Sequence, residues 1–315
     1  MRTAGVAAAA LLAGLALHAP ARAGEAFVTD QGGNAVTVVD LATRKTVATI
    51  PVGGKPAGIA MTPDGTRAYV TSPSAQMVST IDTATRRVIG HFAAPGGPLG
   101  IAVAPDGRTV YVADWYGTDV LAIDPASGQV RTRITVGRSP SGLAVTRDGR
   151  TLVVADRLSD AVSIVDLPSG HERARVAVGA HPFGITLDPA GARAYTADVE
   201  SDSVSAVDVA AGRLIGTVKV GKRPYVVALN GPRGYVTNEL ASTVTAFDLA
   251  TLKPVATIHV GDYPEGIEAG PDGRFVYVVN WDSDNLSVID AAGLSVVATL
   301  PLGDSPRSFG TFIRR

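Results

Sequence analysis

The sequence contains no cysteine among its 315 residues. This absence excludes disulfides, thiol nucleophiles, cysteine zinc sites and haem attachment through C-x-x-C-H. Histidine is also scarce, because only five are present and His181 alone falls where we expect a functional face. One histidine does not provide the set of ligands that a histidine metal site needs, and it has no evident partners for a histidine-activated nucleophile. The motifs G-x-S-x-G and H-E-x-x-H and the P-loop are absent as well.

Aromatic residues are few, with 7 Phe, 8 Tyr and 2 Trp. The hydrophobic fraction of 46% and the charged fraction of 18% are those of an ordinary globular protein. A core built from Val, Ile, Leu and Ala is typical of a β-rich protein.

Long apolar runs are missing except at the start of the chain. Residues 1–23 combine a positive Arg2, an apolar run and an Ala21-Arg22-Ala23 site, which together predict a secretory signal peptide cleaved after Ala23. We expect a single domain at 24–315, periplasmic or secreted, without a membrane anchor. Without Arg2 and Arg22 there are 26 basic and 29 acidic residues, a net charge of −3, which argues against a nucleic-acid partner.

Two anchors recur along the rest of the chain with one period. Spacings of 42, 42, 42, 42, 40 and 42 residues separate Pro56, Pro98, Pro140, Pro182, Pro224, Pro264 and Pro306. The same spacings separate Asp40, Asp82, Asp124, Asp166, Asp208, Asp248 and Asp290. Two independent anchors with one series indicate a repeat protein with seven units.

Each unit contains four short strand patterns and no helical period. The first two strands are joined by turns such as Pro63-Asp64-Gly65. Four strands in about 40 residues predict one blade of a β-propeller. The chain starts inside a unit at Phe27 and ends after the first strand of another, near Phe312. We therefore predict an all-β, seven-bladed β-propeller with four-stranded blades, whose C-terminal innermost strand joins the N-terminal strands and closes the ring.

The motifs at 235–238 (YVTN), 162–166 (VSIVD) and 140–144 (PSGLA) carry a family resemblance. They resemble the YVTN-repeat, YncE-like seven-bladed β-propellers over about residues 27–312. The resemblance implies an exported and mostly non-catalytic propeller. Propellers associated with alcohol catabolism that depends on the quinone cofactor PQQ have a similar length and repeat. Related repeats also occur in lactonases, streptogramin lyases and subunits of quinoprotein dehydrogenases.

The seven units serve as controls for one another. The Asp that closes the third strand is present in all of them, and we interpret it as a cap for the following turn. A second ring of mostly Asp and Asn follows the second strand: Asp30, Ser72, Asp114, Asp156, Asp198, Asn238 and Asn280. We interpret this ring as bonding within its own loop, with binding as the alternative.

Loop positions that vary between units are better candidates for function. They lie beside the anchor Pro or after the Asp/Asn ring, on the face where we expect the channel mouth. The candidate binding residues are Trp115, Arg157, His181, Phe183, Arg223, Tyr225, Glu239, Tyr263, Glu265, Trp281, Asp282 and Arg307.

Glu268 is an anomaly in the innermost strand. The equivalent residues are Ala60, Ala102, Ala144, Thr186, Ala228 and Gly310. A carboxylate in a crowded channel needs a partner or water. Arg307, Lys222 and Arg223 are the expected partners, and Glu268 is a further candidate binding residue.

The leading hypothesis is a monomeric, exported binding or interaction module without a cofactor. Its partner would be another exported protein or a small ligand, and by family analogy it would assist periplasmic oxidation chemistry. One alternative is a metal-assisted lyase or lactonase. A calcium-like divalent cation would then bind oxygen ligands near Glu239, Asp262, Glu265 and Asp282. The other alternative is DNA binding, as suggested for some YncE-like relatives.

Overall fold

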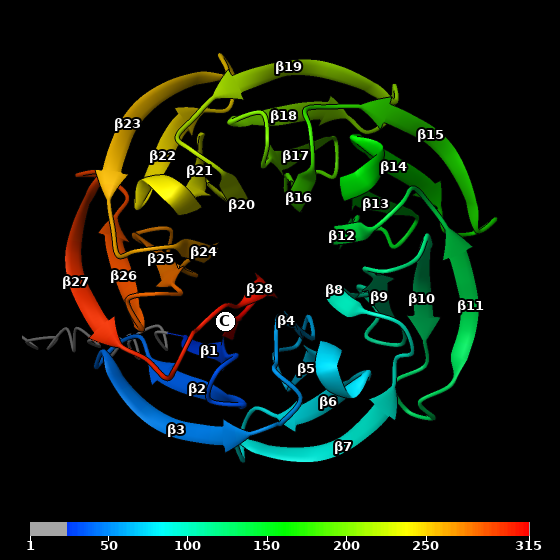
Figure 1. Ribbon diagram of the computed structural model, residues 1–315, viewed down its shortest axis with the longest axis horizontal. Coiled ribbons are helices and arrows are strands. Elements are labelled where there is room, and N and C mark those ends of the chain that lie inside the picture. The colour runs from blue at the N-terminus through cyan, green and yellow to red at the C-terminus, as the bar shows by residue number, and fades with distance from the viewer. Residues whose placement is uncertain (1–23, 315) are drawn as a thin grey trace, which may run out of the picture.

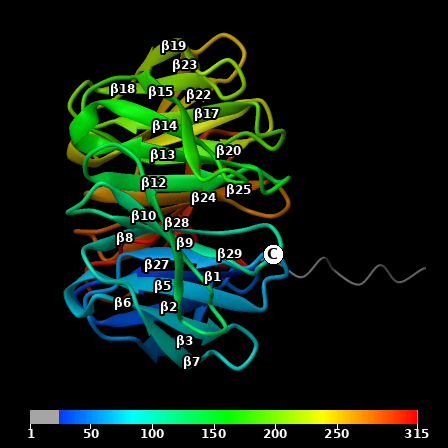
Figure 2. The ribbon, with the colours of Figure 1, turned by 90° about the vertical axis from the view of Figure 1, so that its right-hand side faces the viewer.

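The computed structural model describes residues 24–314 and consists of seven β-sheets arranged in a ring (Figure 1). The predicted signal peptide lies outside the described residues. Within residues 24–314, no helix is long and apolar enough to cross a membrane. The ring is flat when viewed from its edge (Figure 2).

Blades are numbered here from the first complete unit. Blade 1 contains β4 (Gly58–Met61), β5 (Arg67–Ser72), β6 (Met77–Asp82) and β7 (Arg87–Ala93). Blade 2 contains β8 (Pro98–Val103), β9 (Val110–Asp114), β10 (Asp119–Ile123) and β11 (Val130–Thr135). Blade 3 contains β12 (Pro140–Val145), β13 (Thr151–Asp156), β14 (Ala161–Asp166) and β15 (His171–Ala177). Blade 4 contains β16 (Pro182–Leu187), β17 (Arg193–Asp198), β18 (Ser203–Asp208) and β19 (Arg213–Lys219).

The remaining blades complete the ring. Blade 5 contains β20 (Pro224–Asn230), β21 (Arg233–Asn238), β22 (Thr243–Asp248) and β23 (Lys253–His259). Blade 6 contains β24 (Pro264–Ala269), β25 (Phe275–Asn280), β26 (Asn285–Asp290) and β27 (Ser295–Pro301). Blade 7 contains β1 (Glu25–Asp30), β2 (Ala35–Asp40), β3 (Lys45–Pro51) and the C-terminal β29 (Ile313–Arg314), and β28 (Phe309–Thr311) precedes β29. Short 3-10 helices follow β5, β13 and β21: η1 (Pro73–Ala75), η2 (Arg157–Ser159) and η3 (Glu239–Ala241).

Burial follows the position of a strand in its blade. The two middle strands are packed on both sides by neighbouring blades, and in β13 and β14 nearly every residue is buried. Outermost strands such as β15 alternate between exposed and half-buried residues, with one buried Val near the end. A strand packed on both faces needs a continuous apolar run, whereas an outer strand needs one apolar anchor. The core therefore lies between blades, around the whole ring.

The closing Asp of the third strand caps the following turn, as predicted. In all seven blades its carboxylate accepts the backbone N–H of the residue two or three positions later in the chain. For example, the N–H of Thr43 donates to Asp40 and that of Thr251 donates to Asp248, each at 2.7 Å. These N–H donors lower the pKa of the Asp40 and Asp248 carboxyls below the ordinary value.

The second Asp/Asn ring is structural, but it bonds a neighbouring strand more than its own loop. Asp198 accepts the Ser205 hydroxyl at 2.7 Å, and Asn238 donates to the Thr245 hydroxyl at 2.9 Å. These side chains are fully buried. A Cβ on Gly179 would lie 2.6 Å from Asp198, so only glycine fits beside the buried carboxyl.

Burial sets the protonation of the acids in this ring. It raises the pKa of Asp30 to about 6 and the pKa of Asp156 and Asp198 to about 7, although hydroxyl donors oppose the shift. Blades 5 and 6 carry the neutral Asn238 and Asn280 at the same position.

The C-terminal segment closes the ring, as the sequence predicted. Its Pro306 bridges to Asp30, and β29 pairs antiparallel with β1. Between these two contacts, β28 leaves blade 7 and pairs in parallel with β4 of blade 1. Gly310 allows this approach, because it has a φ of +125° and an added Cβ would lie 2.2 Å from the Ile59 carbonyl oxygen. One segment thus joins two blades.

This detour lengthens the closing segment relative to its counterparts. In blade 6, Ala269 pairs with Val276 five residues after Pro264. In blade 7, Ile313 pairs with Ala26 seven residues after Pro306. Glu268 of blade 6 faces the returning segment, and its Oε2 accepts the backbone N–H groups of Phe312 at 2.6 Å and Ile313 at 2.9 Å. Contrary to expectation, its expected cation Arg307 pairs with Glu265.

Replacing Asp198 with Asn tests the buried acid ring. The folded pKa of Asp198, about 7, lies above the ordinary value of 3.8, so the fold holds a proton that the unfolded chain releases. Stability should therefore fall as pH rises from about 4 to about 7. We expect Asp198→Asn to be more stable than wild type at pH 8 by roughly 1–3 kcal/mol, and similar at pH 4.5. Denaturant melts at both pH values measure this.

The reverse change in the next blade is the matched control. Asn238→Asp should add the same pH dependence, because Asn238 occupies the equivalent buried position. Identical pH profiles for wild type and both variants would contradict the assignment.

Replacing Glu268 with Ala tests the ring closure. The change restores the residue common at this position but leaves the buried N–H groups of Phe312 and Ile313 without this acceptor. Each buried N–H without an acceptor costs about 1–3 kcal/mol, so we expect a clearly lower thermal midpoint. The matched control is Thr186→Ala, which removes only the hydrogen bond to the Val227 carbonyl and should cost about 1 kcal/mol. A midpoint for Glu268→Ala at or above the wild-type value would show that Glu268 is only a tolerated irregularity.

Candidate functional site

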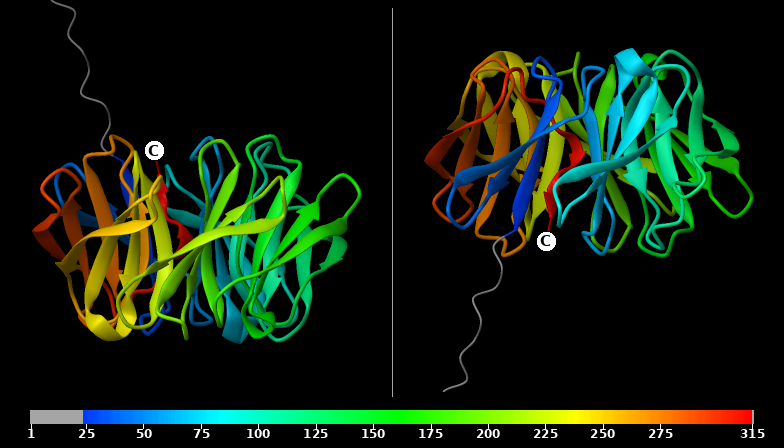
Figure 3. Two further views of the ribbon diagram at one scale, coloured as in Figure 1. Left: turned by 90° about the horizontal axis from the view of Figure 1, so that it is seen from above. Right: turned by 90° about the horizontal axis from the view of Figure 1, so that it is seen from below.

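Two sets of loops meet on one face of the ring. In each blade, the loop after the second strand lies beside the loop that leads into the innermost strand of the same blade. The backbone N–H of Trp115 donates to Gly97, that of Glu239 to Arg223 and that of Trp281 to Tyr263, each at 2.9 Å. This is called the loop face, and the other side, where β29 ends, is called the turn face. The two faces are separated by the length of the strands (Figure 3).

The axis of the ring is closed near the loop face. The residues after the anchor Pro converge there, and Phe183, Tyr225 and Phe309 form an aromatic plug. The Phe183 ring centroid lies 4.1 Å from that of Tyr225 and 4.6 Å from that of Phe309. Phe183 is 3% exposed and Tyr225 is 7% exposed. The open channel mouth expected from the sequence is therefore a shallow pocket with a solid floor.

The pocket above the plug, called the loop-face pocket, has a volume of about 280 Å³. Six of the candidate binding residues line it: Trp115, Arg157, Phe183, Arg223, Tyr225 and Arg307. The sequence comparison missed other lining residues: Gln31, Pro73, Gly97, Leu99, Tyr116 and Val199. Several of these occupy the same ring positions, and the 81% exposed Tyr116 directly follows Trp115. Their ring positions could have identified them, but small or apolar side chains such as Gly97 and Val199 gave no chemical reason to select them.

Two ion pairs stand at the edge of the plug. Arg307 Nε lies 2.8 Å from Glu265 Oε2, and the Arg307 guanidinium also donates to the Tyr225 hydroxyl. Arg223 Nε lies 2.8 Å from Glu239 Oε2. In the first pair Glu265 is buried and the Arg307 side chain is 19% exposed, whereas the Arg223 side chain of the second pair is 44% exposed.

Burial dominates the electrostatics of this cluster. It raises the pKa of Glu265 to about 7, with Arg307 opposing the shift and Glu239 adding to it. Burial also raises the pKa of Tyr225 well above its ordinary value. For Arg307, burial lowers the pKa, but Glu265 and Tyr225 outweigh it and the guanidinium stays charged.

Arg157 differs from the other two arginines of the pocket. Its guanidinium lies over the Trp115 ring, 5.2 Å from the centroid, and Trp115 meets Phe183 edge-on at 5.7 Å. Within residues 24–314, no carboxylate forms an ion pair with Arg157. Three arginines line the pocket, and two of them are paired with Glu239 and Glu265. The pocket therefore has one positive charge in excess.

The other candidates lie elsewhere. Tyr263 and Trp281 contact each other on the loop face with ring centroids 6.0 Å apart, outside the pocket, and the backbone N–H of Asp282 donates to Asp262 at 3.3 Å. His181 takes a positive φ of 54°, and its backbone N–H donates to Asp160 at 2.8 Å.

The carboxylates considered for a cation do not converge. Glu239 and Glu265 each pair with an arginine, and Asp262 accepts the Ser242 hydroxyl at 2.8 Å. In the part of the chain that the structure describes, no group of three acidic or imidazole side chains is placed to hold a metal ion. Beside Glu239 and Glu265 the positive charge is supplied by guanidinium groups.

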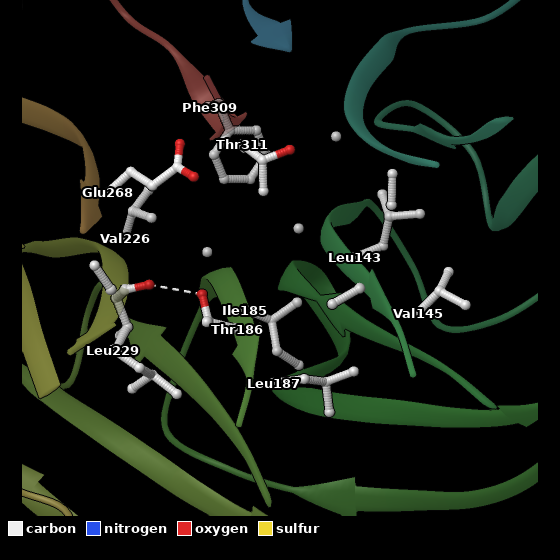
Figure 4. A pocket seen from close by; sticks show the side chains of 18 of the residues that line it. Leu143, Val145, Ile185, Thr186, Leu187, Val226, Leu229, Glu268, Phe309 and Thr311 are labelled. Carbon is white, nitrogen blue, oxygen red and sulfur yellow. Dashed lines mark hydrogen bonds between the residues drawn. The ribbon is translucent and has the colours of Figure 1, made fainter. Parts of the chain in front are cut away.

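A second cavity lies on the other side of the plug and extends toward the turn face. Its volume is about 450 Å³, and the innermost strands supply its walls (Figure 4). Glu268 and Thr311 point into it from one side, opposite Leu143 and Val145. Since Glu268 holds the closing segment through its Oε2, its role in this wall is structural.

Paired substitutions test the difference between the two ion pairs. Glu265→Gln leaves the mostly buried Arg307 charged without its partner. Breaking a fully buried pair costs about 3–5 kcal/mol, so we expect a loss of about 2–4 kcal/mol here. Glu239→Gln breaks a partly exposed pair and should cost about 1 kcal/mol or less. Urea unfolding at pH 8 measures both. Equal losses in the two variants would contradict the buried character of the Arg307–Glu265 pair.

Comparison with known proteins supports the architecture. Residues 59–151 match the family model described as YNCE-like beta-propeller, and residues 168–311 match that described as Lactonase, 7-bladed beta-propeller. No curated protein matches the chain. The solved structures include Kuenenia stuttgartiensis hydrazine synthase, with 22% identity, a TM-score of 0.74 and coverage of 90% of this chain and 99% of that one.

Two further structures share the fold. A functionally unknown protein from Desulfotomaculum acetoxidans has 17% identity, a TM-score of 0.78 and the same coverages of 90% and 99%. Dihydro-heme d1 dehydrogenase NirN, in complex with DHE, has 19% identity and a TM-score of 0.68, covering 94% of this chain and 76% of that one. At these identities the likeness concerns the fold alone. The chain is thus a seven-bladed β-propeller, in which residues 59–151 are similar to the YncE-like propellers and residues 168–311 to the lactonase propellers.

Proposed function

We propose that this protein is an exported binding module that takes its ligand in the loop-face pocket. The observation that carries the proposal is the combination of an aromatic floor with arginines at its edge, in a pocket built from four or more blades. Concave sites with apolar walls and a few placed polar groups are the usual ligand sites of proteins.

The paired acids favour binding over catalysis. A general base needs a carboxylate that can accept a proton from a substrate. Glu239 and Glu265, the acids nearest the pocket, are each engaged by an arginine. Glu268 lines the second cavity and not the loop-face pocket, and its Oε2 accepts two backbone N–H groups.

Export is part of the proposal and is supported by the predicted leader at 1–23. N-terminal sequencing of the protein from the periplasm of a bacterial host should begin at Gly24. The accessory role in periplasmic oxidation chemistry, including the link to PQQ-dependent catabolism, likewise stays a proposal. A dehydrogenase or cytochrome gene beside this one would support that role.

Catalysis of the lactonase kind is the second candidate, favoured by the family match over residues 168–311. A set of γ- and δ-lactones, assayed with and without added divalent cations, tests it. We expect hydrolysis at the buffer rate in every case. A cation-dependent rate that a chelator removes would establish the enzyme and overturn the binding proposal.

The two tryptophans allow binding to be localised. Trp115 lines the pocket, and Trp281 occupies the same ring position in blade 6 but lies outside it. In a Trp281→Phe variant, a bound small molecule should change the fluorescence of Trp115 saturably and raise the thermal midpoint. In a Trp115→Phe variant, which keeps Trp281, the same molecule should leave the fluorescence unchanged. A saturable response from Trp281 alone would place the ligand elsewhere.

A further inference from the structure

We propose that the loop-face pocket binds a small planar aromatic carboxylate, with its ring against Trp115, Phe183 and Tyr225 and its carboxylate on Arg157. This inference rests on the proposed function and names the chemical class of its ligand.

The floor and wall of the pocket select a flat ring. The Phe183 and Tyr225 rings line the pocket but are packed on most sides by protein, so they present a small, rigid apolar surface to a ligand. Trp115 stands edge-on to Phe183 and supplies the adjoining wall. Aromatic rings attract each other in offset and edge-to-face arrangements, beyond the gain from burial. A saturated or branched ligand would lose this contribution.

Arg157 favours a ligand with a negative charge. Arg223 and Arg307 are neutralised by Glu239 and Glu265, so an incoming anion would compete with an ion pair that is already formed. Arg157 has no such competitor within residues 24–314 and is held over the Trp115 ring. A guanidinium binds a carboxylate through two parallel hydrogen bonds, and a stacked guanidinium loses less freedom on binding.

The same charges disfavour other ligands. The excess positive charge of the pocket repels an organic amine, and a neutral ring forms no ion pair with Arg157. The volume of about 280 Å³ lies below the usual range of roughly 300–1,000 Å³ for drug-sized ligands, so we expect a ligand of one or two fused rings.

Three probes that share a ring and differ in charge test the proposal. They are 2-naphthoate, 2-naphthalenemethanol and 2-naphthylmethylamine, titrated by calorimetry into the full-length mature protein at pH 8. We expect the acid to bind at least tenfold tighter than the alcohol, and the amine to bind most weakly. Arg157→Gln should weaken binding of the acid at least tenfold and leave binding of the alcohol within about twofold, a difference of about 1.4 kcal/mol or more for the acid alone.

Arg147→Gln is the matched control. It removes one guanidinium from the second cavity, so it changes the net charge equally without touching the loop-face pocket. Binding of the acid should survive this change. Loss of binding in Arg147→Gln, with Arg157→Gln unaffected, would place the ligand in the other cavity and overturn the proposal.

The remaining outcomes distinguish an error in the class of ligand from an error in the binding site itself. Equal affinity for all three probes, lost together in Trp115→Ala, would keep the pocket as a binding site and overturn the selection for carboxylates. Failure of all three probes to bind the wild-type protein at millimolar concentration would overturn both. Unchanged thermal midpoints for Arg157→Gln and Arg147→Gln would exclude misfolding as the cause of any loss.

Discussion

The hydrogen bonds between the closing segment and the first strand are the interaction on which the rest of the structure depends. The middle strands of every blade need an apolar neighbour on both faces, so an open ring would expose two sheets to water. β29 pairs with β1, and β28 reaches across to β4, so one short segment joins two strands of two different blades. Glu268 supports the return of this segment by accepting two of its N–H groups.

Closure also explains why polar groups are buried near the axis. Seven innermost strands converge, and the residues after the anchor Pro come together in a small space. Aromatic rings fill part of it, and the Arg307–Glu265 pair fills another part with charges that neutralise each other. The plug and the pair create the floor and edge of the loop-face pocket, so the candidate site is a consequence of how the ring is filled.

The comparison of repeats predicted the scaffold well and the site in part. The period placed the blades, the capping Asp residues and the closing segment, because these depend on local turn chemistry that recurs in each unit. It also selected Trp115, Arg157 and Tyr225, which lie together. It could not separate them from Tyr263 and Trp281, since all of these occupy ring positions that vary in the same way. Glu268 was identified as unusual, but its hydrogen-bond partners are backbone groups that no residue pattern marks.

The sequence by itself determined that the chain forms seven four-stranded blades, because strand alternation, turn residues and spacing are local properties repeated along it. Only the tertiary structure decided which variable residues meet. Ring closure brings residues from distant blades to one axis, as in the contact between Phe183 and Phe309. It also decided which arginine lacks a carboxylate partner, since Glu239 meets Arg223 across two loops of blade 5 and Glu265 of blade 6 meets Arg307 of the closing segment. Pairing across space depends on the register and packing of the whole ring, which the residue pattern of one blade does not contain.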